Sequence, residues 1–348
     1  MNRLRAAGAS SDQDFPALVL TAGLGTRLQP LSDIRAKPAL PVAGEPLIAR
    51  ILAWLHRAGV RRVVLNLHHR PDTITRIVGD GSQFGLSVRY SWEPEILGSA
   101  GGPARAIPLL ASDRFLIVNG DTLTHVDLRA LARQHVDTNA LVTMAVVDAD
   151  PRYNAVVADE AGIIQSFGTS GTPGTPGPPT LARHPASSGE VSPERPSAAQ
   201  AETFARFHFI GVQIVNAAVF AGVDPNVKSE TVHGIYPPLM AGRTGSVRIF
   251  HTRKRFFDIG SPRDYLETAR YFAASEERPL DRGRDTTVDG SAHLVDTILW
   301  DRVRVGANAQ LIRCIVADDV AIAPGARFAD CSIVMRGREM IVVPFDGR

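Results

Sequence analysis

The chain has 348 residues, of which 44% are apolar and 21% charged, with a formal net charge of +2. This length predicts two or three domains, and the composition is that of a globular protein with a buried core. No run approaches the ~20 apolar residues of a transmembrane helix, and the net charge indicates no basic surface for nucleic acid. We therefore expect neither a membrane nor a nucleic acid as partner.

The N-terminus and the cysteines indicate the compartment. Small and polar residues, 6–14, follow Arg3 and Arg5, where a signal peptide would carry an apolar segment. The two cysteines of the chain are too few for a disulfide framework. We expect a cytoplasmic protein in which residues 1–14 form a disordered tail.

Apolar strands and helical segments alternate after this tail. Strands are predicted at 15–21, 62–66, 86–91, 114–118 and 140–147, and helices at 46–59, 71–78, 100–110 and 127–136. The alternation predicts an α/β fold with a Rossmann-like mixed, mostly parallel sheet flanked by helices. Ligands of such sheets bind beyond the carboxyl ends of the strands. The turns after 15–21 and after 114–118 are therefore the expected places for a site.

A Pro/Gly/Ser-rich stretch, 168–203, lies between two further predicted strands, 163–167 and 206–215. It holds seven prolines and five glycines, too few apolar groups to offset the entropy of ordering the chain. We predict a disordered insertion that interrupts one domain, because the strand pattern resumes after it.

The C-terminal region repeats itself every 17 residues. Ala292, Ala309 and Ala326 each open a similar triplet, and Cys314 and Cys331 keep the same step. Short apolar triplets with Gly-Ala turns at this period predict a parallel β-helix over 281–336, followed by a tail at 337–348. We expect the coils to serve packing or self-association as a homo-oligomer, and the cysteines to be core thiols.

The most informative motif is a glycine-rich turn after the first strand, in Leu20-Thr-Ala-Gly-Leu-Gly-Thr-Arg-Leu-Gln-Pro-Leu31. Such a turn lets backbone N–H groups approach phosphate oxygens. Arg27 adds a planar charge, and Lys37 is one of only three lysines in the chain. Leu28 at the third glycine position excludes a Rossmann fingerprint, and no Gly-Lys-Ser/Thr follows for a P-loop. The alternative is an ordinary turn whose glycines serve packing.

The string from Leu20 to Pro46 resembles the signature of the sugar-1-phosphate nucleotidyltransferases, especially the mannose-1-phosphate guanylyltransferase-like group. Four further stretches agree with it, namely Asn66-Leu-His-His69, Gly98-Ser-Ala-Gly-Gly102, Asn119-Gly-Asp121-Thr and Phe257-Asp258-Ile-Gly-Ser-Pro262. The resemblance covers about residues 15–335 apart from the insertion. It implies a nucleotidyltransferase domain at 15–280 and an appended left-handed β-helix.

The resemblance also implies roles for individual residues. Arg27, Lys37 and Asp121 would be catalytic, and Asp121 and Asp258 would hold Mg²⁺. Magnesium takes one or two carboxylates together with substrate phosphates, although each aspartate alone is also an ordinary loop residue. The implied nucleotide contacts are Leu20, Ala22, Gly23, Leu24, Gly25, Thr26, Arg27, Asn66, Gly98, Ser99 and Gly101.

The sugar side carries less information. Asn154 stands where many relatives have a glycine in a Tyr-Gly-Val-Val stretch, and the lysine that usually follows in a Glu-Lys-Pro is absent. Asn154 and Gly211 remain the candidates for the sugar phosphate. The adjacent His68 and His69 would point to opposite faces of an extended chain, which argues against a metal pair.

The implied reaction is attack by a sugar 1-phosphate on the α-phosphorus of a nucleoside triphosphate, giving a nucleotide-sugar and pyrophosphate. GTP and mannose 1-phosphate are the expected pair, with UTP or dTTP and another sugar phosphate as an alternative. A second alternative is a non-catalytic regulatory or structural partner of an active paralogue. Arg27, Lys37, Asp121 and Asp258 are all present, which favours an enzyme.

Overall fold

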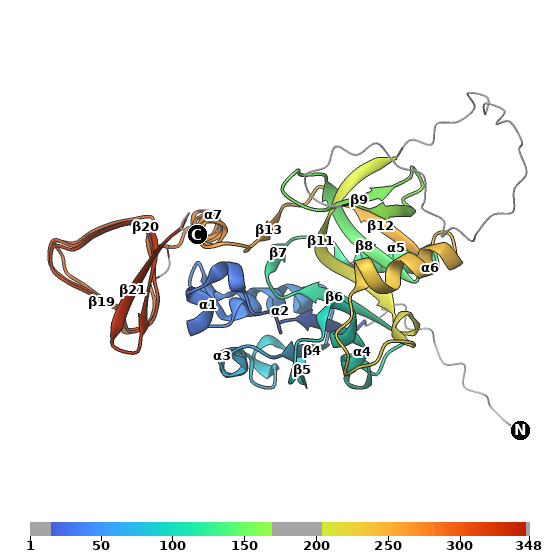
Figure 1. Ribbon diagram of the computed structural model, residues 1–348, viewed down its shortest axis with the longest axis horizontal. Coiled ribbons are helices and arrows are strands. Elements are labelled where there is room, and N and C mark those ends of the chain that lie inside the picture. The colour runs from blue at the N-terminus through green and yellow to red at the C-terminus, as the bar shows by residue number, and fades with distance from the viewer. Residues whose placement is uncertain (1–14, 169–203, 281, 346–348) are drawn as a thin grey trace, which may run out of the picture.

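The computed structural model describes residues 15–168, 204–280 and 282–345. The predicted tail, 1–14, and nearly all of the predicted insertion, 169–203, lie outside these residues. A nine-stranded mixed sheet forms the centre of the molecule (Figure 1), with the order β10-β9-β11-β6-β1-β4-β5 and with β8 joining β11 to β12. Its strands are β1 (Ala17–Leu20), β4 (Arg62–Leu67), β5 (Ser87–Trp92), β6 (Arg114–Asn119), β8 (Val142–Asp148), β9 (Ala155–Ala158), β10 (Ile164–Phe167), β11 (Ala205–Asn216) and β12 (Val247–His251).

The parallel part of the sheet carries the expected alternation of strand and helix. Strands β6, β1, β4 and β5 pair in parallel, as do β8 and β12, whereas β11 is antiparallel to β6, β8 and β9. The helices are α1 (Leu31–Ile34), α2 (Leu47–Arg57), α3 (Pro71–Val78), α4 (Gly98–Leu110), α5 (Leu128–Asp137), α6 (Tyr236–Gly242) and α7 (Pro262–Ser275). None of the helices in the described ranges combines the length and apolarity needed to cross a membrane.

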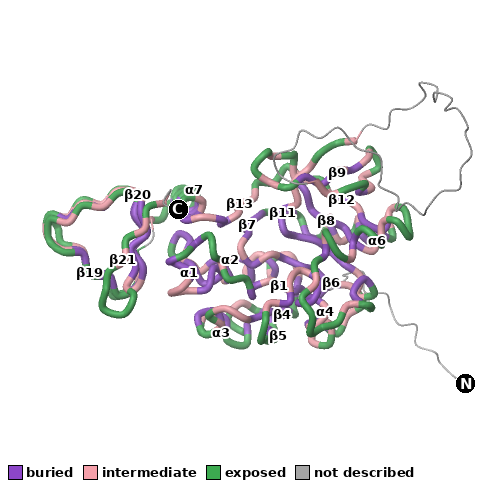
Figure 2. The backbone as a smooth tube through the Cα atoms, in the orientation of Figure 1, coloured by how far each residue is buried: buried purple, intermediate pink, exposed green. Residues whose placement is uncertain are grey.

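Two apolar cores cover the two faces of the sheet. Along β1, Leu18 packs into the core that contains α4, whereas Ala17 and Val19 pack into the core that contains α2 and α7. This alternation follows from the two-residue period of a strand. Successive residues of the central strands are therefore buried in one core or the other, and most of the tube at β1 and β4 has the colour of buried residues (Figure 2).

Short elements that the sequence patterns do not predict lie beside the sheet. Strand β7 (Thr122–Thr124) pairs antiparallel with β13 (Phe256–Asp258), and β2 (Pro41–Val42) with β3 (Glu45–Pro46). Single helical turns are η1 (Thr26–Leu28), η2 (Lys37–Ala39), η3 (Ser82–Phe84), η4 (Ala217–Phe220) and η5 (Thr231–Ile235). Segments of two to five residues are too short to carry a hydrophobic period, which explains why sequence analysis misses them.

The C-terminal strands stack in parallel at the 17-residue step of the sequence repeat. Cys314 pairs with Cys331, and Leu294, Leu311 and Phe328 follow one another across three coils. The strands are β14 (Thr287–Val288), β15 (His293–Val295), β16 (Ile298–Leu299), β17 (Arg304–Val305), β18 (Gln310–Val316), β19 (Ala321–Ile322) and β20 (Arg327–Arg336). Both cysteines are buried free thiols, as predicted for core residues.

The predicted tail at 337–348 is wrong for its first part. Strand β21 (Glu339–Pro344) turns back at Gly337, which has φ +64°, and pairs antiparallel with β20. Most of its side chains are exposed. Its backbone ladder with β20 holds it in place, and Ile341 is partly buried against the main core. The short apolar run at 340–343, predicted as part of the tail, forms this strand.

His135 on α5 supplies a pH-dependent contribution to stability. Its ring is buried, with Nδ1 2.9 Å from Thr143 Oγ1 and Nε2 2.9 Å from Asn216 Oδ1. Burial lowers the pKa of His135; the hydrogen bond to Asn216 opposes this effect and the charge of Arg114 adds to it. The neutral ring is therefore the form that the fold favours.

We predict that His135 stabilises the protein above its unfolded-state pKa of about 6.5, and that this stability is lost as the pH falls through the lower folded-state pKa. The unfolded chain binds the proton more readily there. The free energies of unfolding of the parent and His135→Gln, measured in urea, should differ more at about pH 7.5 than at about pH 5. An equal difference at both pH values would contradict the buried neutral ring.

Candidate functional site

The site begins where three parallel strands end in register. Leu20 of β1 pairs with Asn66 of β4 on one side and with Asn119 of β6 on the other. The turns that leave these strands therefore meet at one edge of the sheet, as expected for an α/β fold. They border a cleft lined by Leu20, Thr21, Gly23, Gly25, Thr26, Arg27, Leu28, Lys37, Pro38, Asn119, Gly120, Asp121 and Gly260.

The glycine-rich turn forms one wall of this cleft. Gly25 adopts φ +63°, and a Cβ added there would lie 3.2 Å from Ser32 Cβ. Both observations explain the glycine, because a side chain would be strained and crowded. Thr26 and Arg27 follow in an exposed single turn, whereas an added Cβ at Gly23 would meet open space. The backbone of the turn is thus accessible to a ligand.

Lys37 lies opposite the turn between two carboxylates. Its Nζ is 2.7 Å from Asp121 Oδ2 and 4.0 Å from Asp258 Oδ1. The two aspartates, 137 positions apart in the sequence, are brought together by the pairing of β7 with β13, which sets Asp258 opposite Thr122. The sequence predicted these three residues for one site, and the structure groups them.

Asp258 carries a shifted pKa. Burial raises the pKa of this carboxyl and the charge of Asp121 raises it further, while Lys37 and Arg27 act in the opposite direction. Two carboxylates in a partly buried site repel one another unless cations stand nearby. The site therefore favours additional positive charge beside Asp121 and Asp258.

A third carboxylate, Asp264, joins the site at Gly260. A Cβ added at Gly260 would lie 3.0 Å from Arg27 Nη1, 3.2 Å from Asp258 Oδ2 and 3.2 Å from Asp264 Oδ2. Sequence analysis missed Asp264, because Ser261-Pro-Arg-Asp264 is a helix-start signature. Ser261 does cap α7, and its hydroxyl donates to Asp264 Oδ2 at 2.7 Å.

Asn66 serves the framework of the site. Its Oδ1 accepts the Thr21 N–H at 2.6 Å, and its Nδ2 donates to Glu93 Oε1 at 2.7 Å. Glu93 is fully buried and also accepts the Leu97 N–H at 2.9 Å. Asn66 itself is 3% exposed and does not line the cleft at Lys37. Its contact with a nucleotide stays a prediction, whereas its hydrogen bonds connect the end of β1 to Glu93.

Gly98, Ser99 and Gly101 stand apart from the Lys37 cleft. They begin α4, where the Ser99 hydroxyl donates to Glu230 Oε2 at 2.6 Å and accepts the Thr231 N–H at 2.9 Å. A Cβ at Gly101 would lie 2.6 Å from Val227 O, so this glycine allows the 227–231 segment to approach. Of the other predicted contacts, Ala22 is buried and Leu24 is 44% exposed; neither lines the Lys37 cleft.

The two predicted sugar-side residues lie on different elements. Gly211 has φ +74°, and a Cβ there would come within 2.7 Å of the Asn119 side chain. It lies at a register shift in β11, and β11 pairs with β6, the strand that leads to Asp121. Asn154 is exposed beside Tyr153, whose ring stacks on His208 at 4.1 Å.

The adjacent histidines have separate partners. His68 Nδ1 lies 2.9 Å from Glu93 O, and His69 Nε2 lies 2.8 Å from Ser32 O. Within the described ranges, no group of three or more His, Cys, Asp or Glu side chains is arranged to hold a metal. A metal at the cleft would therefore rely on two aspartates and on ligand oxygens, a donor set that suits magnesium.

Comparison with known proteins bears on the family resemblance. Residues 16–168 match the sequence model of the nucleotidyl transferase family. The mannose-1-phosphate guanylyltransferase of Mycobacterium tuberculosis is 28% identical over 324 residues, which cover 91% of this chain and 82% of that protein. These matches support a sugar-1-phosphate nucleotidyltransferase. The resemblance drawn from its motifs is confirmed.

A second relative has higher identity over a shorter range. The N-acetylmuramate alpha-1-phosphate uridylyltransferase of Neisseria meningitidis is 46% identical over 115 residues, which span 33% of this chain and half of that protein. Among solved structures, HddC from Yersinia pseudotuberculosis aligns with a TM-score of 0.58 and 22% identity, covering 74% of this chain and 99% of that chain. This likeness confirms the Rossmann-like mixed α/β fold.

The network around Asn66 yields a stability prediction. Asn66→Ala removes the buried partner of the Thr21 N–H and one of the two donors to the Glu93 carboxylate, so it should lower the free energy of unfolding by about 2–5 kcal/mol in urea. The control is Asn226→Ala, which removes an exposed hydrogen bond to Arg105. It should change stability by no more than about 0.5 kcal/mol. Equal effects of the two variants would show that Asn66 does not hold the strand end.

Proposed function

We propose that the protein transfers the guanylyl group of GTP to mannose 1-phosphate, forming GDP-mannose and pyrophosphate. The observation that carries this proposal is the group of Lys37, Asp121 and Asp258 opposite the glycine-rich turn. The similarity to the Mycobacterium tuberculosis guanylyltransferase over most of both chains supports guanine and mannose. The fold relative HddC, solved with GMP-PN, supports a nucleotide in this fold.

The chemistry follows from charge. The sugar phosphate is already an anion, so its attack on the α-phosphorus needs positioning and charge neutralisation rather than a strong base. The accessible Gly23–Thr26 backbone would receive phosphate oxygens, and Arg27 and Lys37 would offset the negative charge that collects on the leaving pyrophosphate. Gly211 and Asn154 remain the proposed sugar-side residues.

Magnesium is the proposed cofactor, with Asp121 and Asp258 as its protein ligands. The fit rests on the oxygen donors of the two carboxylates, which lie 2.7 Å and 4.0 Å from the same Lys37 Nζ. When bound, the ion would supply further charge stabilisation at the reacting phosphates. Asp264 lies next to this pair and would add to the negative field that attracts the ion.

One alternative is favoured by a specific observation. The 46% identity to a uridylyltransferase over 115 residues supports the same reaction type with UTP and another sugar 1-phosphate. A regulatory paralogue is less well supported, because the charged residues of the cleft are retained. For the C-terminal coils we propose the left-handed β-helix implied by the resemblance; their parallel pairing at a constant step supports it. Self-association through these coils is part of the same proposal.

The direct test is pyrophosphate release with Mg²⁺ across five nucleoside triphosphates and several sugar 1-phosphates. We expect release that requires both substrates and peaks with GTP and mannose 1-phosphate. A peak at UTP would replace the guanylyltransferase by the alternative. If no substrate pair releases pyrophosphate while active control enzymes do, the proposed enzyme activity is refuted and a regulatory role is favoured.

Asp121→Asn tests the metal assignment. The change removes one of two carboxylates, so Mg²⁺-dependent turnover should fall about a hundredfold or more while the melting temperature stays near that of the parent. Rates are measured against magnesium concentration. Asp72→Asn is the matched control, because Asp72 pairs with Arg76 on the surface of α3 and should keep parental activity. A near-normal rate in Asp121→Asn would remove Asp121 from the metal site.

A further inference from the structure

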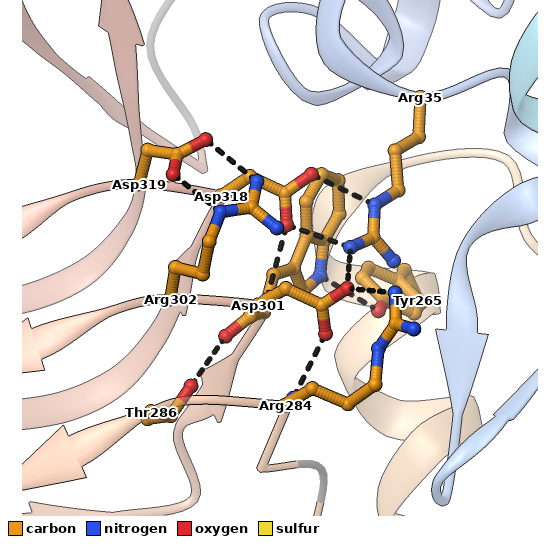
Figure 3. A network of polar contacts seen from close by, with 9 residues as sticks. Arg35, Tyr265, Arg284, Thr286, Asp301, Arg302, Asp318 and Asp319 are labelled. Atoms are coloured by element: carbon orange, nitrogen blue, oxygen red, sulfur yellow. Dashed lines mark hydrogen bonds and ion pairs between the residues drawn. The ribbon is translucent and has the colours of Figure 1, made fainter.

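Arg35 joins the segment of residues 35–41, here called the Lys37 segment, to the C-terminal coils. It caps α1 two residues before Lys37, and its guanidinium reaches Asp318 through Nε at 2.9 Å and Nη2 at 2.6 Å. Nη2 is also 3.0 Å from Asp301 Oδ2. Asp301 and Asp318 are one 17-residue step apart, so the arginine is held by two successive coils (Figure 3).

The same coils hold the other end of the Lys37 segment. Trp300 is fully buried beneath the Arg35 guanidinium, 5.0 Å from it, and its Nε1 donates to the Tyr265 hydroxyl at 3.2 Å. That hydroxyl donates to Pro41 O at 2.6 Å. The contacts therefore fix residues 35 and 41, on either side of Lys37.

Tyr265 connects this arrangement to the second carboxylate. It lies in the first turn of α7, which begins four residues after Asp258. Coil residues share one apolar core with α1, α2 and α7; they are Ile298, Trp300, Ile315, Ala317 and Val334. The coil face toward the catalytic part is thus packed as an interior.

Burial distinguishes the Arg35 pair from the other ion pairs of the coils. The side chains of Arg35 and Asp318 are 18% and 14% exposed, whereas those of Arg302 and Asp319 are 50% and 59% exposed. Exposed pairs contribute little, but removing one partner of a largely buried pair leaves a charge that water does not solvate. Removing the carboxylate charge of Asp318 should therefore displace Arg35. Removing that of Asp319 should leave the residues near the cleft in place.

We propose that the C-terminal coils position the catalytic lysine: Arg35, held by Asp301 and Asp318 over Trp300, sets Lys37 against Asp121 and Asp258. Arg35 is thus a positioning residue that acts through Lys37. The inference deepens the proposed transferase function and rests on it for its catalytic consequence. A misplacement of about 1 Å at a reacting group lowers rates by up to about a hundredfold, so a small shift of residues 35–41 matters.

The test compares Asp318→Asn with Asp319→Asn in the full chain. Both remove one carboxylate from a two-bond arginine pair on the same coil, but only Asp318 faces the Lys37 segment. We expect kcat to fall about tenfold to a hundredfold in Asp318→Asn, with a smaller change in KM for either substrate. Asp319→Asn should stay within about twofold of the parent.

Hydrogen exchange supplies a readout that does not depend on turnover. Backbone amides of residues 35–41 should exchange faster in Asp318→Asn than in Asp319→Asn, with unchanged protection of β1, β4 and β6. If the parent is inactive on the substrate grid, the proposed function fails, and this exchange difference still decides the positioning. Equal exchange and equal kcat in the two variants would overturn the proposal.

Two further variants guard against misfolding and test coupling. Arg35→Lys keeps the charge but loses the two-bond fork, and it should reproduce the kcat loss if Asp318→Asn does not fold. Adding Asp318→Asn to Arg35→Lys should lower kcat by less than the product of the single losses, because both changes remove one contact. Independent, multiplicative losses would contradict a shared positioning role.

Discussion

The ion contact between Lys37 and its two aspartates is the constraint on which the rest of the structure depends. Three charged groups from distant parts of the chain meet within 4.0 Å. Such a group is stable only where the backbone fixes each member, because like charges on Asp121 and Asp258 repel one another. The parallel strands, the β7–β13 pair and the packed Lys37 segment supply that fixation. The fold thus holds the two carboxylates of Asp121 and Asp258 beside the ammonium group of Lys37.

This arrangement explains why glycine and buried polar groups gather at one edge of the sheet. Gly25 and Gly211 adopt backbone angles that other residues avoid, and each allows a close approach near the cleft. Asn66 and Glu93 satisfy donors that the end of β1 would otherwise leave unpaired. The hydrogen bonds of Asn66 hold one side of this edge, and its open face is formed by the glycine-rich turn. A hydrogen-bonded support and an accessible backbone together suit phosphate binding, which needs donors already in place.

The sequence predicted the elements with a strong hydrophobic period and the residues of long motifs. It predicted the alternating strands and helices and the 17-residue repeat. It also assigned Lys37 and two aspartates to one site. It missed Asp264, because a carboxylate at the start of a helix reads first as a cap. It also gave no sign of Arg35, since arginine is common in this chain and its partners lie more than 260 positions away. Contacts of that kind depend on tertiary packing and carry no local pattern.

The coils and the catalytic part are linked by interior packing. Trp300 and Tyr265 are both fully buried, and their polar atoms bond to each other and to the Lys37 segment. Burying an indole and a phenol together is favourable only if N–H and O–H find partners, which fixes the relative placement of coil, α7 and segment. A shift of the coils would therefore break these bonds or carry the segment along. The coils therefore act on the cleft from outside its lining, through Arg35 and the two aspartates that their repeat provides.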